Sequence, residues 1–496
     1  MGDANLKVHV VTPFGACDVL ALVTYEGGER EVQIRQGRYE ATLPGRPLRL
    51  RFLDEAVEST ETSPSISGDE QGGVAVTVDQ LFGDGVDVPA SGELNVLAVW
   101  GTPCHQRVET DEGRRFGSFE HQMCANTVGL DKEGQPESMQ GAVAPLNKDE
   151  LLRVGNSELR FGDIIALAGD FYAFYDARAV KELSWAWPEL GGFTGWLSGR
   201  DYREPSLASA EAKDSANILE IIKRDKDADH GVAGETCQLV DDSVKGTYPA
   251  RRYLALASQN YCHFGSQPAD GTVDDERNLA LQLYRAYHKR ALEAARAAGD
   301  DQRALGEAFA CDAFGCHFLT DLFASGHMRV PRRELGEKYG ILIGALRKSH
   351  AMHAEDNAHG LWVAARGSLG SNARIVWRAY GDGMLRTDQA ATHLAQVTEA
   401  VRLSAREVFA ASCGVSVMEN ECAEWWLPHP LAAGETPRAS DQVLGDADPT
   451  VANHYPLYWL LPTGDIATRV GKRHESRYRF KTGLLQSLDI EFGQVQ

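Results

Sequence analysis

Over the first hundred residues, apolar and polar side chains alternate in short runs. These runs are LKVHVV (6–11), VLALVTY (19–25), REVQIRQ (30–36), PLRLRFL (47–53), GVAVTV (73–78) and LNVLAVW (94–100). Gly, Pro and Asp separate them, and this pattern is typical of a β-sandwich or a small barrel. We therefore expect an all-β domain over residues 1–105. It holds no cluster of catalytic residue types, which favours an accessory or packing role.

Between residues 106 and 425 the apolar residues follow a helical period. Residues 275–299 and 386–412 predict helices, the first with an acidic start and a glycine stop. Residues 311–326 predict a buried helix between them. From residue 426 to 496 Pro and Gly are frequent, and residues 477–493 predict two short strands. The expected fold is mainly α, with an N-terminal all-β domain and a small C-terminal β element that packs on the rest.

The buried helix carries polar residues that need partners. His317, Asp321 and His327 form the pattern H-x3-D-x5-H among large apolar residues. Positions 317 and 321 share one helical face, and Gly326 can bend the chain before His327. Imidazole and carboxylate groups are good zinc ligands. A metal site and a hydrogen-bonded polar cluster both explain the pattern, because buried polar groups require partners.

Other segments supply further candidates for the same site. Residues 347–363, RKSHAMHAEDNAHGLWV, place His353 one helical turn from Asp356 and Asn357. Residues that stand in apolar surroundings further upstream are His121, Asp170 and His263. The same segments also contain His350, Glu355, His359 and Asp163. Some of these polar side chains are expected to be solvated helix ends.

In their order along the chain, these residues resemble the zinc-dependent phospholipase C family and the single-strand-specific zinc nucleases. The H-x3-D-x5-H helix, the His263–Phe264 pair before a long helix, and His353 with a following carboxylate carry the resemblance. It covers roughly residues 110–370 and is nearest to a bacterial branch of zinc metallophospholipases C. The fungal heterokaryon-incompatibility proteins are a more distant relation. The resemblance implies a helical bundle as the catalytic domain, over residues 106–425, and a mixed element over 426–496.

The resemblance also implies a centre of two or three zinc ions, with Asp170 orienting or deprotonating the attacking water. The implied ligands are Asp170, His263, His317 and Asp321 for one ion, His327, His353 and Asp356 for a second, and His121 with a shared Asp321 for a third. The family usually has a carboxylate four residues after the last histidine. Here that position is Asn357, so the last ligand is open among Asp356, Glu355 and Asn357 itself. The family's N-terminal tryptophan ligand is missing here unless the chain is cleaved, because a β domain precedes the helical part, and His121 is expected to hold that neighbourhood without it.

Charge and composition narrow the expected substrate. The chain has 496 residues and a formal net charge of -21, which argues against a nucleic-acid groove. The loop SWAWPELGGFTGW (184–196) has Trp185, Trp187 and Trp196, which suit a membrane interface or a choline cage, although an ordinary packed loop also explains them. No membrane-spanning run and no secretory signal are seen, so we expect a cytoplasmic protein or export by a specialised route.

The predicted activity is that of a phospholipase C, a zinc-dependent phosphoric diester hydrolase. It would cleave phosphatidylcholine or a related glycerophospholipid into diacylglycerol and a phosphorylated headgroup. Two zinc ions would lower the pKa of a water and stabilise the charge on the phosphoryl oxygens. A single-strand nuclease is the second enzymatic interpretation. A non-catalytic interaction protein related to the heterokaryon-incompatibility group is the third.

Overall fold

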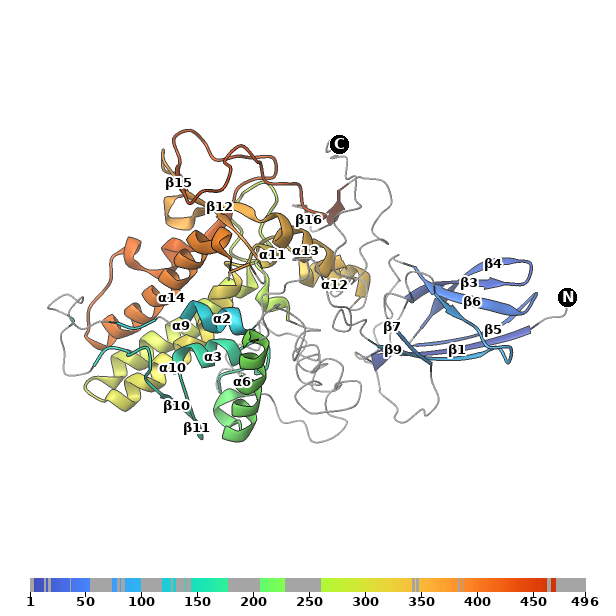
Figure 1. Ribbon diagram of the computed structural model, residues 1–496, viewed down its shortest axis with the longest axis horizontal. Coiled ribbons are helices and arrows are strands. Elements are labelled where there is room, and N and C mark those ends of the chain that lie inside the picture. The colour runs from blue at the N-terminus through green and yellow to red at the C-terminus, as the bar shows by residue number, and fades with distance from the viewer. Residues whose placement is uncertain are drawn as a thin grey trace.

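A computed structural model describes most of the chain (Figure 1). The described residues are 4–53, 74–99, 118–176, 206–227, 260–461 and 465–469, apart from gaps at 13–14, 17–18, 36, 78–80, 82–84, 126–127, 131–138, 140–143, 341–343, 345–347, 382–383 and 386. Within this part, a β domain lies at one end and a helical body fills the other (Figure 1). The segment 184–196, with its three tryptophans, lies outside the described residues, as do the strands expected at 477–493.

The N-terminal domain is a sandwich of two sheets, as the alternating pattern predicts. One sheet has the order β2-β1-β9-β7, with β5 also paired to β1, and the other has the order β4-β3-β6-β8. The strands are β1 (Ala4–Thr12), β2 (Gly15–Ala16), β3 (Val19–Tyr25), β4 (Gly28–Ile34), β5 (Arg38–Leu43), β6 (Pro47–Phe52), β7 (Val74–Thr77), β8 (Val86–Asp87) and β9 (Glu93–Val99). Alternate residues face inward, such as Leu6 and Val8 of β1 and Val19 and Ala21 of β3. They form a core separate from that of the helical body.

Three long helices form the framework of the helical body. They are α9 (Leu279–Ala298), α10 (Gln302–Asp321) and α14 (Ala391–Ser412), and they pack against one another. The side chains of Asn278 and Asp301 cap the first two by accepting from backbone N–H groups. From Leu305 to Asp321, α10 is buried on nearly every face, so it is the central helix. The last residues of α10 therefore project into the interior of the body.

Shorter elements surround this framework. They are α2 (Ser118–Ala125), β10 (Leu152–Val154), β11 (Ser157–Leu159), α3 (Phe161–Leu167), η4 (Leu207–Ser209), α6 (Ala212–Asp227), η5 (Tyr261–His263), α11 (Ser325–Met328), α12 (Arg332–Gly340) and α13 (Ser349–His359). The helices α2 and α3 pack on each other, and α3 packs on α10. Tyr339 of α12 also packs against the core of the β-sandwich, so this helix joins the two parts. Among the described helices, none combines the length and hydrophobicity that a membrane crossing requires.

A four-stranded sheet completes the body and includes residues from the C-terminal region. Its order is β14-β12-β13-β15. The strands are β12 (Leu361–Ala365), β13 (Ile375–Ala379), β14 (Pro428–Pro430) and β15 (Gln442–Leu444), with short helices η7 (Arg366–Ser368), η8 (Asp388–Ala390), η9 (Glu419–Glu421) and η10 (Ala423–Trp426). The chain ends in a hairpin of β16 (Tyr458–Leu460) and β17 (Ile466–Thr468). The region after residue 425 thus supplies strands to a sheet that begins before it.

Candidate metal centre

The centre begins at the C-terminal end of α10. His317 and Asp321 are fully buried one turn apart, with Nε2 of His317 3.3 Å from Oδ2 of Asp321. Nδ1 of His317 donates to the carbonyl of Ile165 at 3.0 Å. A carbonyl can only accept, so the proton lies on Nδ1 and the lone pair of Nε2 faces Asp321. This is the arrangement that orients a histidine for a metal ion.

His121 of α2 is oriented in the same way. The hydroxyl of Thr320 donates its one proton to a backbone carbonyl of its own helix, that of His317 at 2.7 Å. It can therefore only accept from Nδ1 of His121, which lies 2.7 Å away. Nε2 of His121 then presents its lone pair toward Oδ1 of Asp321, at 3.7 Å. Burial lowers the pKa of both His121 and His317, so each imidazole is neutral and able to bind a metal ion.

Asp321 is the hub of the centre. Its Oδ2 lies 3.0 Å from Nδ1 of His263, and its Oδ1 lies 2.9 Å from Nδ1 of His327. Burial favours the protonated carboxyl, but the neighbouring imidazoles, His263 first, outweigh it and hold the pKa of Asp321 well below its usual value. A carboxylate that has an imidazole near each of its two oxygens could serve as a ligand for two metal ions.

The hydrogen bonding at the centre fits a metal ion. Neither oxygen of Asp321, nor Nε2 of His263, has a hydrogen-bond partner of acceptable geometry among the described residues, although all three atoms are buried. Buried polar atoms without partners are rare because desolvating them is costly. Ligand atoms that share one metal ion lie close together and do not form hydrogen bonds with one another, as these atoms do.

Two overlapping groups of residues could hold a metal ion. His263, His317 and Asp321 form one, and His121, Asp170 and His317 form the other, with ligand atoms within 4.8 Å of one another in each group. Asp170 is half-buried in the turn that follows α3. The preceding Gly169 has φ +70°, and a Cβ there would lie 2.3 Å from Nε2 of His317. Only glycine lets the backbone pass this close to the imidazoles.

His327 and His353 form the other side of the centre. The short helix α11 carries His327 and α13 carries His353, and their ring centroids are 5.0 Å apart. The ring of Phe264 lies 4.7 Å from the ring of His327. We call the region between these two imidazoles the α11–α13 position; it is not one of the two groups of described residues whose ligand atoms converge.

Asn357 joins the two helices at the α11–α13 position. Its Oδ1 accepts from the backbone N–H of Gly326 at 2.7 Å, and its Nδ2 donates to Nδ1 of His353 at 3.2 Å. A Cβ at Gly326 would lie 2.4 Å from this oxygen. Asn357 therefore links α11 to α13. As an amide, it supplies no carboxylate to a metal ion. The α11–α13 position therefore has fewer negatively charged side chains than the groups around His317.

The structure does not bring Asp356 or Glu355 to the centre. The Asp356 carboxylate is bound by Arg329 and by Nε2 of His454, at 2.8 Å from the latter. Arg329 and His454 outweigh burial and lower the pKa of Asp356 to about 2. Glu355 pairs with Arg469 at 2.7 Å. The placement of Asp356 among the zinc ligands is thus not supported, because its charge is neutralised by protein partners.

Most of the remaining sequence candidates lie apart from these ligand atoms. Asp163 accepts from the backbone of Arg160 and from the side chain of Gln122. His359 lies at the end of α13 beside the ring of His454. His350 stacks beside His353, with ring centroids 6.3 Å apart. Sequence reasoning missed Thr320 and Gly169, whose roles follow from contacts with residues distant in the chain.

Comparison with models of protein families, with characterised proteins and with solved structures finds no match to this chain.

Proposed function

We propose that this protein is a metal-dependent phosphodiesterase that uses zinc and acts on phospholipid as a phospholipase C. The observation that carries the proposal is Asp321, a buried carboxylate surrounded by His121, His263, His317 and His327, with no hydrogen-bond partner for either oxygen among the described residues. Neutral imidazoles and a carboxylate form the donor set that zinc prefers. The order of the same residues along the chain supports the choice of a phosphodiester substrate.

The residues around His317 would hold the firmer zinc ion, and the α11–α13 position the weaker one. Bound zinc supplies a Lewis acid for the phosphoryl oxygens and lowers the pKa of a water toward neutrality. Asp170, half-buried beside His121 and His317, would orient that water and take its proton. The apolar residues around the site, such as Phe264 and Phe318, limit the access of bulk water.

Charge favours lipid over nucleic acid as the substrate. With a formal net charge of -21, the chain offers little to neutralise a polynucleotide backbone. The assay should therefore compare diacylglycerol release from phosphatidylcholine vesicles with nucleotide release from single-stranded DNA. Release of nucleotides alone would favour the nuclease.

Asp321→Asn is the variant that tests the centre. It keeps the shape of the side chain and removes the charge that all four imidazoles face, so we expect loss of at least one zinc ion and a fall in activity of about 100-fold or more. Zinc per chain is measured by elemental analysis after dialysis. Full zinc content and full activity in Asp321→Asn would refute the proposal.

The matched control is Asp312→Asn. Asp312 is also fully buried on α10 and also bonds a histidine, His288, at 2.7 Å. It lies nine residues before Asp321, or about 13 Å along the helix. This variant should lose stability while keeping its zinc, which separates damage to the fold from damage to the centre.

A further inference from the structure

A cavity of about 500 Å³ lies beside the four-stranded sheet. Residues from the ends of α13 and β13, from the start of α14 and from the loop after β15 line it. Cavities of this size are typical of sites for small molecules. None of the residues around Asp321 is among its lining residues, so it is separate from the metal centre.

Arg378 of β13 is the buried cation of this cavity, and it is only 8% exposed. Strand pairing places it opposite Trp362, and its guanidinium carbon lies 5.7 Å from the centroid of that ring. Its Nη2 donates to the backbone carbonyl of His359 at 2.7 Å. Its Nη1 is buried and has no hydrogen-bond partner among the described residues. In the same part of the chain, no carboxylate forms an ion pair with it.

The missing counter-charge distinguishes Arg378 from two other buried arginines. Arg329 is paired with Asp356. Arg374 is paired with Asp441. A buried charge without a counter-charge is costly, and burial, together with the charge of Arg329, lowers the pKa of Arg378. An anion bound in the cavity would supply the counter-charge.

The cavity also offers hydrogen-bond donors that suit an oxyanion. The phenol oxygen of Tyr380 accepts from Nε2 of Gln389 at 3.2 Å, which leaves the phenol proton for another acceptor. The side chain of Thr392 also lines the cavity. Burial and then the charge of Arg378 lower the pKa of His359, so this imidazole is neutral near pH 7 and adds no second positive charge. Guanidinium and hydroxyl donors are suited to the oxygens of a phosphate or a carboxylate.

Three carboxylates line the same cavity at exposed positions, those of Asp388, Asp446 and Asp448. None of them forms an ion pair with Arg378. The cavity therefore has one buried positive group and, apart from it, a negative rim. The rim disfavours a ligand that is only an anion, and Arg378 disfavours one that is only a cation.

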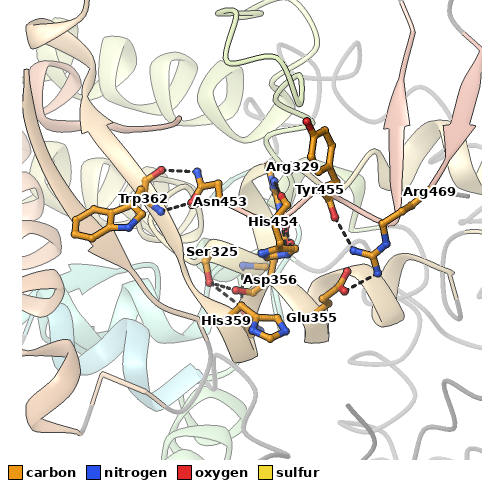
Figure 2. Close-up of polar contacts among 12 residues, drawn as sticks. Ser325, Arg329, Glu355, Asp356, His359, Trp362, Asn453, His454, Tyr455 and Arg469 are labelled. Atoms are coloured by element: carbon orange, nitrogen blue, oxygen red, sulfur yellow. Dashed lines mark hydrogen bonds and ion pairs between the residues drawn. The ribbon is translucent and has the colours of Figure 1, made fainter. Parts of the chain in front are cut away.

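The loop that carries two of these carboxylates, residues 445–451, is anchored to the sheet. The indole N–H of Trp362 donates to the carbonyl of Val451 at 2.9 Å. Figure 2 shows the next anchor, in which Asn453 accepts from the backbone N–H of Trp362 at 2.7 Å and donates to its carbonyl at 2.9 Å. Because the ring of Trp362 also lies against Arg378, one residue positions both the loop and the guanidinium.

We propose that this cavity binds a small zwitterion, with an oxyanion (a phosphate or a carboxylate) at Arg378 and an ammonium group at Asp388, Asp446 and Asp448. Such a ligand supplies the missing counter-charge and is attracted by the rim at its other end. The inference does not rest on the metal centre. Phosphoethanolamine and β-alanine are soluble molecules of this kind, and phosphatidylethanolamine presents the same groups on a lipid.

The first test is calorimetric titration of the full chain with phosphoethanolamine, and separately with inorganic phosphate and with ethanolamine. We expect phosphoethanolamine to bind at least about 10-fold more tightly than either half, because only the whole molecule meets both charges. β-Alanine tests the carboxylate form in the same way. The affinities should be unchanged in Asp321→Asn, which lacks the hub of the metal centre. If neither zwitterion binds, or if Asp321→Asn abolishes the binding, the inference is overturned.

Arg378→Gln should weaken the binding of phosphoethanolamine and of inorganic phosphate by about 10–100-fold, because charge-assisted hydrogen bonds are lost. The matched control is Arg374→Gln. Arg374 is also buried and directly precedes β13, but it is paired with Asp441 and does not line the cavity. Its variant should lose stability and keep both affinities. An equal loss of affinity in the two variants would contradict the assignment.

The exposed rim provides a test that holds even where Arg378→Gln fails to fold. Asp388→Asn combined with Asp446→Asn should weaken phosphoethanolamine binding by about 5–10-fold and tighten the binding of inorganic phosphate. Damage to the fold would not move the two affinities in opposite directions. Asp149→Asn combined with Asp300→Asn changes the net charge equally at exposed positions outside the cavity, and should change neither affinity. Equal effects of the two pairs, or a shift of both ligands in one direction, would refute the site.

Sedimentation with vesicles of phosphatidylethanolamine distinguishes a lipid headgroup from a soluble ligand. A lipid ligand predicts sedimentation that free phosphoethanolamine reverses and that Arg378→Gln loses. A soluble ligand predicts calorimetric binding of phosphoethanolamine with the protein left in the supernatant. Both results support the zwitterion site, whereas sedimentation that Arg378→Gln leaves intact, with no calorimetric binding, would overturn it.

Discussion

At the scale of single residues, Asn357 decides how much negative charge lies beside His353. Its amide oxygen is held by the N–H of Gly326 and its amide nitrogen by His353. A carboxylate of the same shape could keep the first bond, since its oxygen also accepts, and would place a negative charge beside His353. The neutral amide therefore limits the affinity of the α11–α13 position for a cation.

Asn357→Asp should tighten the binding of the second zinc ion by about 10-fold, because a charged ligand replaces a neutral group. The affinity is measured by calorimetric titration of the metal-free protein. The first zinc ion, held around His317, should bind with unchanged affinity. An equal gain for both ions, or no gain for either, would contradict this account of the position.

The residues of the centre could be predicted from sequence to the extent that their partners lie nearby in the chain. His317 and Asp321 are one helical turn apart, and their contact follows from helical geometry alone. Spacing alone cannot show that Arg329 and His454 bind the carboxylate of Asp356. His454 stands alone in its segment, and no local pattern indicates that it faces α13.

At the scale of elements, a second buried polar cluster fixes the packing of α9, α10 and α14. Nδ1 of His288 lies 2.7 Å from Asp312, and its Nε2 lies 3.4 Å from Glu407. Ser404 donates to the same Asp312 carboxylate at 2.9 Å. Burial disfavours the charged imidazole, but Asp312 and then Glu407 outweigh it and raise the pKa of His288 to about 10.

This cluster predicts a pH dependence of stability with a definite sign. Because the folded-state pKa of His288 lies above its unfolded value of about 6.5, its contribution is complete below pH ~6.5 and is lost as the pH rises through about 10. His288→Asn should cost about 3–5 kcal/mol at pH 6 and progressively less toward pH 10. Urea unfolding of both proteins across this range measures the difference. A difference that is constant with pH would refute the assignment.

The long helices and the alternating strands were predictable, whereas the elements that bend the chain at the centre were not. The predicted helices at 275–299 and 386–412 correspond to α9 (Leu279–Ala298) and α14 (Ala391–Ser412). The helix predicted over 311–326 ends at Asp321, and α11 begins at Ser325. The break follows from the fixed positions of Tyr380 and Asn357, which accept from the N–H groups of Ser325 and Gly326. Such tertiary partners leave no periodic signal.

At the scale of the whole molecule, the two separate cores predict two unfolding events. The core of the sandwich and the core of the helical body share no member residue, and Tyr339 of α12 is a described side chain that packs against the former from outside. Domains with independent cores commonly unfold as separate cooperative units. Metal binding stabilises only the unit that contains the site.

We therefore expect two calorimetric transitions, of which zinc raises only that of the helical body. A ligand at about 1,000 times its Kd stabilises a protein by about 4 kcal/mol, which corresponds to a shift of about 5–10 °C for a unit of this size. In Asp321→Asn the shift should be absent, because the hub of the centre is lost. If zinc moved the sandwich transition equally, the contact through Tyr339 would couple the two parts, and the β domain would have to be counted as part of the catalytic unit.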